Sequence, residues 1–238
     1  MEKEKKIKIF LGSSYLLIIF IFLWFFFSYF TIQDFTSYEL IKANRDSLNE
    51  IKNNNIILTS ILFFAAVVLW VLLLGFASPV FLIGGFIFGK WLGTLLVVFG
   101  LSVGSTLLYI FANFFLKDTI KQKFSSRFSN LLNKSKNNEF LFFLIYRFVG
   151  GIPFFISNIL PTLFNVKVKI FFVGSLIGMT PQLFVGVTLG AGLNKFLENN
   201  LNPPTFMDLF MSSDIYLPII GIIILIFLGF FLRKRFFQ

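Results

Sequence analysis

Runs of about 20 apolar residues, separated by short polar segments, recur along this sequence. A helix of that length spans the roughly 30 Å hydrocarbon core of a bilayer. Hydrophobic residues make up 57% of the 238 residues and charged residues 13%, whereas soluble domains carry about 25% charge. The sequence therefore predicts an all-α, polytopic membrane protein.

Five transmembrane helices are predicted. The run after the basic residues 1–8 is too long for a signal peptide, so it is interpreted as an uncleaved first span. A short amphipathic helix is expected before residue 55, and an interfacial helix or a solvated loop at 117–138. We divide the chain into a first helix with its connector (1–55), a membrane core (56–195), and a polar loop with the last helix (196–238). The predicted spans are Leu11–Phe30, Ile56–Phe76, Trp91–Leu116, Val168–Leu189 and Leu217–Leu232.

The absence of certain residues limits the chemistry. Cysteine and histidine are both missing, which excludes disulfides, thiolate nucleophiles and Cys/His metal sites. All 11 acidic residues lie outside the predicted spans, so proton-coupled transport through a buried carboxylate is disfavoured. No nucleophile–base pair is visible, and neither an enzyme nor a cofactor is predicted. The net charge of +10 resides in loops and tails, which favours anionic lipids over nucleic acid as the partner.

The apolar run Phe140–Phe164 is interrupted by helix breakers at Gly150, Gly151 and Pro153. Each half has about ten residues and is therefore roughly 15 Å long, half the hydrocarbon core. This pattern predicts a re-entrant hairpin, which enters the membrane, turns and leaves on the same side. A kinked full span is the alternative.

A second broken segment, Phe76–Trp91, contains Pro79, Gly84, Gly85 and Gly89. An offset of 74 residues aligns Pro79 with Pro153 and also aligns the glycine pairs of two later helices, a weak internal repeat. With one span between them, two such hairpins would enter from opposite faces and meet near the midplane. Regularly spaced glycines would allow close helix packing around that site: Gly93, Gly100, Gly104, Gly174 and Gly178.

Arg147 is the one charge well inside an apolar segment, and an intramembrane arginine is costly, by about 2.5–3.5 kcal/mol on insertion scales. Without an acid nearby in the membrane, it must meet carbonyls, water or an anion. A guanidinium binds phosphate through paired hydrogen bonds. We therefore predict substrate binding by Arg147, with Asn158 as the second polar group, where Asn158 could instead hold the turn. The alternative for Arg147 is snorkelling to the nearby interface or capping the Gly150 carbonyls.

These motifs resemble the VTT-domain superfamily, also called the DedA or SNARE-associated Golgi protein superfamily, over about residues 70–195. The similarity is greatest to the subgroup of the yeast Golgi vesicle protein and its bacterial inner-membrane relatives. Two family positions depart from the pattern: Gly150 stands where a proline is usual, and Asn113 where an arginine often ends the third span. The matching residues are Pro79, Gly85, Phe88, Gly89, Gly93, Gly100 and Gly104 in the first half, and Arg147, Pro153, Phe154, Asn158, Gly178 and Pro181 in the second.

The resemblance implies two facing re-entrant hairpins, helix packing at Pro181 and work on lipids, such as phospholipid scrambling or the return of a polyprenyl-phosphate carrier. We expect movement of an anionic lipid headgroup between leaflets, in a bacterial cytoplasmic membrane. A small-solute or ion transporter, or a non-transporting assembly or trafficking protein, is the alternative. The positive-inside rule places the basic 117–138 segment and the tail at 233–235 together in the cytoplasm. The oligomeric state is left open.

Overall fold

The computed structural model describes residues 12–15, 17–22, 24, 28, 55–124, 138–149, 152–199 and 211–237. The chain divides into two units, Met1–Ser47 and Leu48–Gln238. In the first unit an apolar helix occurs at Gly12–Phe22, inside the predicted first span, and the rest of that span is only partly described. The predicted amphipathic helix before residue 55 lies outside the described residues.

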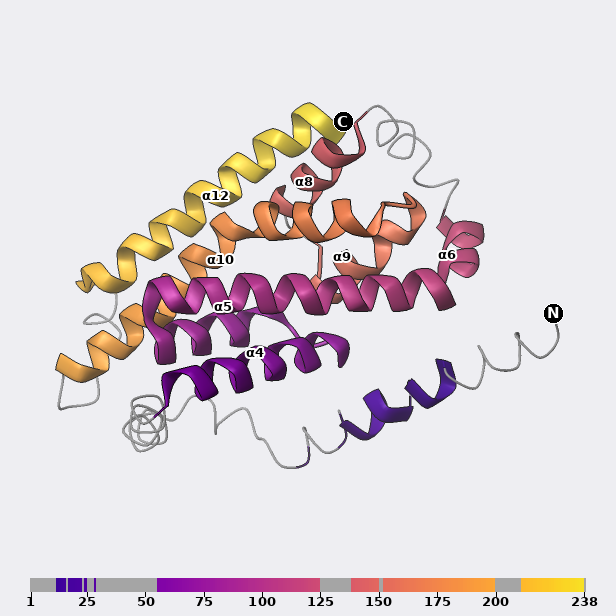
Figure 1. Ribbon diagram of the computed structural model, residues 1–238. Coiled ribbons are helices and arrows are strands. Elements are labelled where there is room, and N and C mark those ends of the chain that lie inside the picture. Colours follow the sequence, from indigo (N-terminus) through magenta and orange to yellow (C-terminus); the bar gives the residue numbers. More distant parts are fainter. Residues whose placement is uncertain are drawn as a thin grey trace. The chain divides into compact units, whose positions relative to one another are not determined.

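Every regular element among the described residues is a helix, which confirms the all-α prediction (Figure 1). Three described helical segments are long and apolar enough to cross a membrane, judged by length and composition: Ala77–Phe115, Val168–Phe196 and Ser213–Leu232. The number of five spans stays a prediction. The elements of the second unit are α4 (Ile56–Leu72), α5 (Ala77–Phe115), α6 (Lys117–Phe124), α8 (Glu139–Val149), α9 (Phe154–Ile159), η1 (Leu160–Leu163), α10 (Val168–Asn199) and α12 (Ser213–Phe237).

Helix α4 begins at a side-chain cap and ends in a tight turn. Asn55 Oδ1 accepts the Leu58 backbone N–H at 3.0 Å, which satisfies one of the free donors of the first turn. After Leu72 the chain reverses through Leu74, whose φ is 63°, and the Trp70 indole donates to the Phe76 carbonyl at 2.8 Å. The predicted span to Phe76 is therefore too long by this turn.

Helix α5 consists of two arms, residues 77–88 and 90–115, joined at Gly89, whose φ of 73° and ψ of −178° are non-helical. The two arms fold back on each other. A Cβ added to Gly93 would stand only 2.5 Å from the Gly84 carbonyl oxygen, which shows the reversal. In a straight helix those two residues would be roughly 13 Å apart. Gly89 adopts the left-handed φ without the steric penalty of a side chain.

The predicted breakers of the first hairpin were therefore mostly misplaced. Pro79 lies in the first turn of α5, where a missing N–H removes no helical hydrogen bond. Gly84 and Gly85 are helical and buried, and Gly85 packs against the α10 backbone at Val187. Only Gly89 breaks the helix. The first hairpin consists of α4 and residues 77–88, with its tip at Leu73–Phe76. The predicted bounds were wrong: the predicted span Ile56–Phe76 forms one arm of the hairpin and its tip, and the segment Phe76–Trp91 supplies only the other arm.

The second hairpin consists of the helices α8, α9 and η1. Its last residues lie next to its first ones, so both arms open toward the same end of the unit. The backbone N–H of Lys167, just after η1, donates to Glu139 Oε1 at 2.6 Å, at the start of α8. The rings of Phe142 and Phe164 lie 5.2 Å apart between their centroids. These contacts agree with the predicted re-entrant hairpin. Pro153 is the N-cap residue of α9, and Gly150 and Gly151 lie outside the described residues.

The first half of the second unit (α4 and α5) and its second half (α8 to α10) pack in the same way. A Cβ on Gly100 or Gly104 would meet Val67 or Val71 of α4 at 2.8 Å. A Cβ on Gly174 or Gly178 would meet Phe143 or Arg147 of α8 at 2.7–2.8 Å. The glycine pairs of the predicted repeat thus make equivalent contacts, each long helix packing on the first helix of its own half. Arg147 occupies the position that Val71 holds in the other half.

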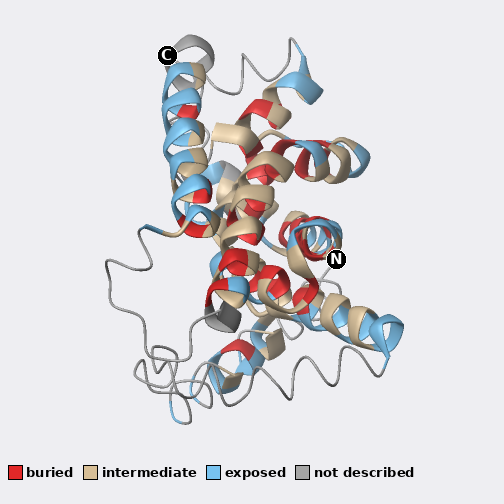
Figure 2. Ribbon diagram, turned by 90° about the vertical axis from the view of Figure 1, so that its left-hand side faces the viewer, coloured by how far each residue is buried: buried red, intermediate tan, exposed pale blue. Residues whose placement is uncertain are grey.

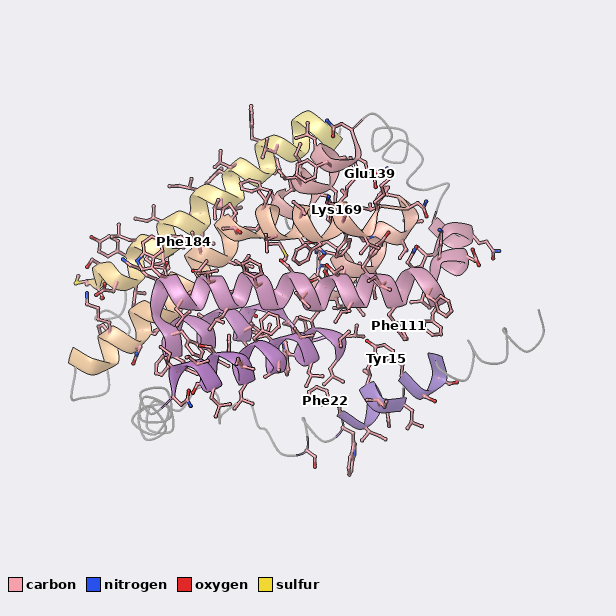
Figure 3. The ribbon with its side chains drawn as sticks, in the orientation of Figure 1. Tyr15, Phe22, Phe111, Glu139, Lys169 and Phe184 are labelled. Carbon is pink, nitrogen blue, oxygen red and sulfur yellow. The ribbon has the colours of Figure 1, made fainter. Side chains whose placement is uncertain are left out.

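The long helices α5 and α10 run antiparallel. Tyr109 stacks on Phe171 with 4.3 Å between ring centroids, and Gly93 lies against Val187. The hairpins therefore enter from opposite ends of the second unit. We call these the Glu139 end, where α8 and α10 begin, and the Lys90 end, next to the Gly89 turn. Figure 3 shows Glu139 and Lys169 together at the former and Phe184 toward the latter.

Helix α12 returns along α10 toward the Glu139 end. Gly192 packs against the Asp214 backbone, and Gly221 packs against Val185, which fixes the antiparallel direction. Helix α10 continues past the predicted end at Leu189, because its last glycines pack closely against neighbouring backbone. The start of α6 and the last turns of α12 are thus at the same end, as predicted. Of the predicted interfacial helix, residues 117–124 form α6 and residues 125–137 lie outside the described residues.

The core lies between the long helices and the hairpins. Tyr109, Phe143, Val166 and Phe171 form a cluster of buried residues near the Glu139 end. Figure 2 shows buried residues concentrated in the inner helices, whereas α12, which carries the C-terminus, is largely exposed. The apolar window of α12 is only 17% buried. An apolar helix with so much exposed surface is suited to contact with lipid tails.

Candidate functional site

Arg147 lies in the last turn of α8, at the tip of the second hairpin, and its side chain is only 4% exposed. Its Nε donates to Ser175 Oγ at 2.9 Å, and its Nη1 donates to Ser157 Oγ at 3.1 Å. The third nitrogen, Nη2, is buried without a partner in the described structure. The guanidinium is thus held by two neutral hydroxyls, and one nitrogen is left to bind something else.

Two aromatic rings flank this guanidinium. Its Cζ lies 4.7 Å from the centroid of Phe171 and 5.3 Å from that of Phe143. A desolvated cation over a ring face gains about 2 kcal/mol. The rings stabilise the charge without neutralising it, and no carboxylate is among the described contacts of Arg147. Snorkelling is wrong, because the side chain is buried in the interior.

The guanidinium lines a cavity of about 210 Å³ between the tips of the two hairpins. The first hairpin contributes Ala77 and Phe81, next to its turn, and α10 contributes Met179 and Gln182. Ser157 and Ile152 line it from the second hairpin. The two tips therefore meet around a cavity, as the facing-hairpin prediction required, and Arg147 is the charged group among its lining residues.

Gln182 fixes the end of α8. Its Nε2 donates to the Arg147 carbonyl at 3.3 Å and also to the Phe148 carbonyl. These carbonyls belong to the last turn of α8, where helical partners are missing. Pro181 precedes Gln182 inside α10 and has no amide hydrogen, so the Ile177 carbonyl receives no helical bond from it. Carbonyl capping at the end of α8 is thus done by Gln182, and the alternative that Arg147 caps the Gly150 carbonyls falls outside the described residues.

Asn158 is fully buried, and both of its polar side-chain atoms lack a partner in the described structure. It makes no described hydrogen bond to Arg147. The neighbouring Ser157 contacts Arg147 instead, and its hydroxyl also donates to the Phe154 carbonyl at 2.7 Å. Substrate binding by Arg147 and Asn158 stays a prediction.

Ser157, Ser175 and Gln182 were missed by the sequence reasoning, which examined charged groups and glycines. A usable signal was present, since each is a polar side chain within an otherwise apolar segment. Such residues are costly in a membrane unless they meet a partner.

Comparison with known proteins agrees with the family resemblance seen in the sequence. The VTT domain family matches residues 76–192. A transmembrane protein 41 homolog of Dictyostelium discoideum is 27% identical over 132 residues, 54% of this chain and 38% of that protein. A transmembrane protein 41 homolog of Caenorhabditis elegans is 25% identical over 161 residues, 65% of this chain and 64% of that protein.

The uncharacterized protein YqeD of Bacillus subtilis is 29% identical over 123 residues, 49% of this chain and 58% of that protein. The chain thus spans between 38% and 64% of the length of these curated relatives. No solved structure matches the chain.

Proposed function

Because the chain belongs to the VTT/DedA superfamily of membrane proteins, we propose that it moves the headgroup of an anionic lipid between the two leaflets of a membrane. The observation that carries this proposal is the unpartnered Nη2 of Arg147 beside the cavity at the hairpin tips. The proposal is transport rather than catalysis, and the lipid phosphate is the group that Arg147 binds.

The chemistry of the site suits a phosphate. Guanidinium binds phosphate through two parallel charge-assisted hydrogen bonds, which are roughly twice as strong as neutral ones. In Arg147 the Nη1 and Nε donors are held by serine hydroxyls, which are neutral and easily exchanged for a charged acceptor. A phosphodiester or a polyprenyl phosphate both present such an acceptor, so each is a candidate substrate.

The lipid tails can remain in the hydrocarbon, outside the cavity. Ile152 lines the cavity and is 37% exposed, and Ile156, on the next turn of the hairpin, is 39% exposed. An apolar surface next to the cavity allows acyl or prenyl chains to stay in hydrocarbon while the headgroup reaches Arg147. The glycine-lined contacts between the hairpins and the long helices permit small rearrangements around this path.

The orientation follows from the charges. The basic α6 starts at the Glu139 end, and α12 runs toward it with Arg233-Lys234-Arg235 in its last turns. Positively charged loops and tails favour the cytoplasmic side. We propose that the Glu139 end faces the cytoplasm, and that the membrane is a bacterial cytoplasmic membrane; one of the three relatives described above, YqeD, is a bacterial protein.

The test is lipid exchange in proteoliposomes, read as the fraction of a fluorescent anionic lipid that dithionite bleaches. Arg147→Ala should slow exchange about tenfold or more, because one hydrogen bond to a charged group is worth about 1.5–3 kcal/mol. Lys90→Ala, which removes an exposed charge at the other end of the same unit, should leave exchange unchanged.

Equal exchange by the wild type and Arg147→Ala would remove Arg147 from the mechanism. Uptake of a small solute without lipid exchange would favour the solute transporter, and the absence of both would favour an assembly or trafficking protein.

A further inference from the structure

A row of buried polar groups lies between α5 and the second hairpin. Ser102, Ser105, Asn158 and Thr162 are all 0% exposed. Asn158 is also the predicted second polar group of the Arg147 site, and the other three have no role there. The described atoms that are buried without a partner are Ser102 Oγ, Ser105 Oγ, Asn113 Oδ1, Arg147 Nη2, Asn158 Oδ1, Asn158 Nδ2 and Thr162 Oγ1.

The register of the helices places these groups in line. Tyr109 donates its hydroxyl to the Val166 carbonyl at 2.5 Å, which joins α5 to the exit of the second hairpin. Both α9 and η1 pack against α5, and both run with it toward the Glu139 end. Ser105 and Thr162 each precede that joint by four residues. Ser105 therefore lies about one helical turn inward of Tyr109 on α5, and Thr162 lies in η1, just before the turn at Phe164 and Asn165 that leads back to Val166.

Ser102 lies about one further turn inward on α5, and Asn158 precedes Thr162 by four residues, in α9. The antiparallel register of α5 and α10, set by Tyr109 against Phe171, places Ser102 near the height of Gly178. Gly178 abuts Arg147. The row thus begins near the guanidinium and runs outward past Ser105 and Thr162. Asn113, one turn beyond Tyr109 on α5, continues it toward the Glu139 end.

Toward the Lys90 end the described structure has no counterpart of this row. The seven unpartnered buried atoms all lie at the height of Arg147 or on its Glu139 side. On the other side α5 presents Gly93 and Val97 to its neighbours, and these contacts are apolar or between backbones. The polar row is therefore one-sided.

Buried polar groups are nearly always hydrogen-bonded, either to protein or to ordered water. A buried water typically makes about three hydrogen bonds to groups that would otherwise lack a partner. Hydroxyls and amides both donate and accept, and they carry no charge that would trap an ion. Polar groups at membrane depth are tolerated where they line a wet cavity.

We propose that Ser102, Ser105, Asn158 and Thr162 bind a chain of water molecules that connects the Arg147 site with the Glu139 end alone. The inference deepens the proposed function, on which its biological meaning rests. The water chain hydrates the Arg147 guanidinium from one side of the membrane. An anionic headgroup that enters from that side therefore loses less of its own hydration.

The test uses the natural absence of cysteine from this chain. Ser105→Cys and Thr162→Cys place a thiol in the row with little change of volume. The matched controls are Leu108→Cys and Leu163→Cys, which are only 1% and 2% exposed but apolar. Ag⁺ is added to right-side-out or inside-out membrane vesicles, and thiols that remain are counted with a fluorescent maleimide after denaturation.

Sidedness is calibrated by two exposed positions, Lys169→Cys at the Glu139 end and Lys90→Cys at the other end. We expect the row thiols to react at least tenfold faster than the apolar controls, and only in the vesicles in which Lys169→Cys reacts. Row thiols as inert as Leu108→Cys, or reaction from the Lys90 side, would overturn the proposal.

A second test measures the melting temperature of the protein and does not need the cysteine variants to fold well. If the row is hydrated, Ser105→Ala and Thr162→Val strip a bound water of a partner, and the melting temperature falls. If the hydroxyls are dry, the same changes remove an unmet polar group, and the melting temperature rises, which would refute the water chain. Neither measurement depends on lipid exchange. A hydrated row in a wild-type protein that exchanges no lipid would contradict the proposed function and leave the water chain standing.

Discussion

Adding one methyl group at Gly178 should displace Arg147 and slow lipid movement. A Cβ at this position would stand 2.8 Å from Arg147 Cβ and 2.8 Å from the Leu144 carbonyl oxygen. Ordinary van der Waals contacts of a Cβ are 3.4–4 Å. Because one obstacle is backbone, α8 must move away from α10 by about 1 Å rather than rotate a side chain.

The expected magnitudes follow from that displacement. Overpacking of this kind costs about 1–3 kcal/mol of stability. A shift of about 1 Å in a positioned group can lower a rate on the order of 100-fold. In Gly178→Ala the shift separates the guanidinium from Ser175, which belongs to α10, so the 2.9 Å bond between them lengthens. We expect a moderate loss of stability and a large loss of lipid exchange.

The internal repeat supplies the control. A Cβ on Gly104 would stand 2.8 Å from Val71 Cβ, the equivalent contact in the first half, where no arginine is present. Gly104→Ala should therefore lose a similar 1–3 kcal/mol of stability and keep its lipid exchange nearly intact. Stability is measured by thermal unfolding in detergent, and exchange by dithionite bleaching in proteoliposomes.

The comparison of these two variants decides the reasoning. If both lose exchange to the same degree, the loss reflects general destabilisation, and the placement of Arg147 is not what matters. If Gly178→Ala keeps full exchange although its stability falls, the guanidinium does not need its observed position.

Two further predictions concern the elements that shape the site. Gly89→Ala should lose about 1–3 kcal/mol of stability, because a φ of 73° with a ψ of −178° is a backbone conformation that essentially only glycine adopts, although a Cβ there meets no atom within 4 Å. Equal unfolding temperatures for the wild type and Gly89→Ala would contradict the role of the turn. Gln182→Leu should lower stability by about 1–3 kcal/mol, because the Arg147 and Phe148 carbonyls are left without their donor. A thermal unfolding scan measures this loss. Gln182→Glu cannot donate a hydrogen bond when its carboxyl is ionised, so it should lose stability as well. Full stability of both variants would exclude capping by Gln182.

Several features of the protein follow from the sequence by itself. The apolar runs determine an all-helical membrane protein, because only structures that satisfy their own backbone hydrogen bonds are stable in hydrocarbon. The placement of Pro153 at the start of α9 and the aligned glycines predicted the second hairpin and the repeat. The isolated charge of Arg147 marked the site, because burial of an arginine in lipid is too costly to occur without a reason.

Other features were decided by the tertiary structure. The sequence offered Pro79, Gly84, Gly85 and Gly89 as equal candidates for the first break, and packing selected Gly89. Proline is harmless in a first helical turn, and a helical glycine can serve close contact as readily as a turn, so composition cannot separate these uses.

The surroundings of Arg147 also came from the fold alone. Ser157 of α9 and the α10 residues Ser175 and Phe171 meet its guanidinium from two different elements, at positions set by how the second hairpin lies on α10. A single sequence records which side chains are polar, but their partners depend on the register between helices. That register is fixed by the long-range glycine contacts, which act only once the chain has folded.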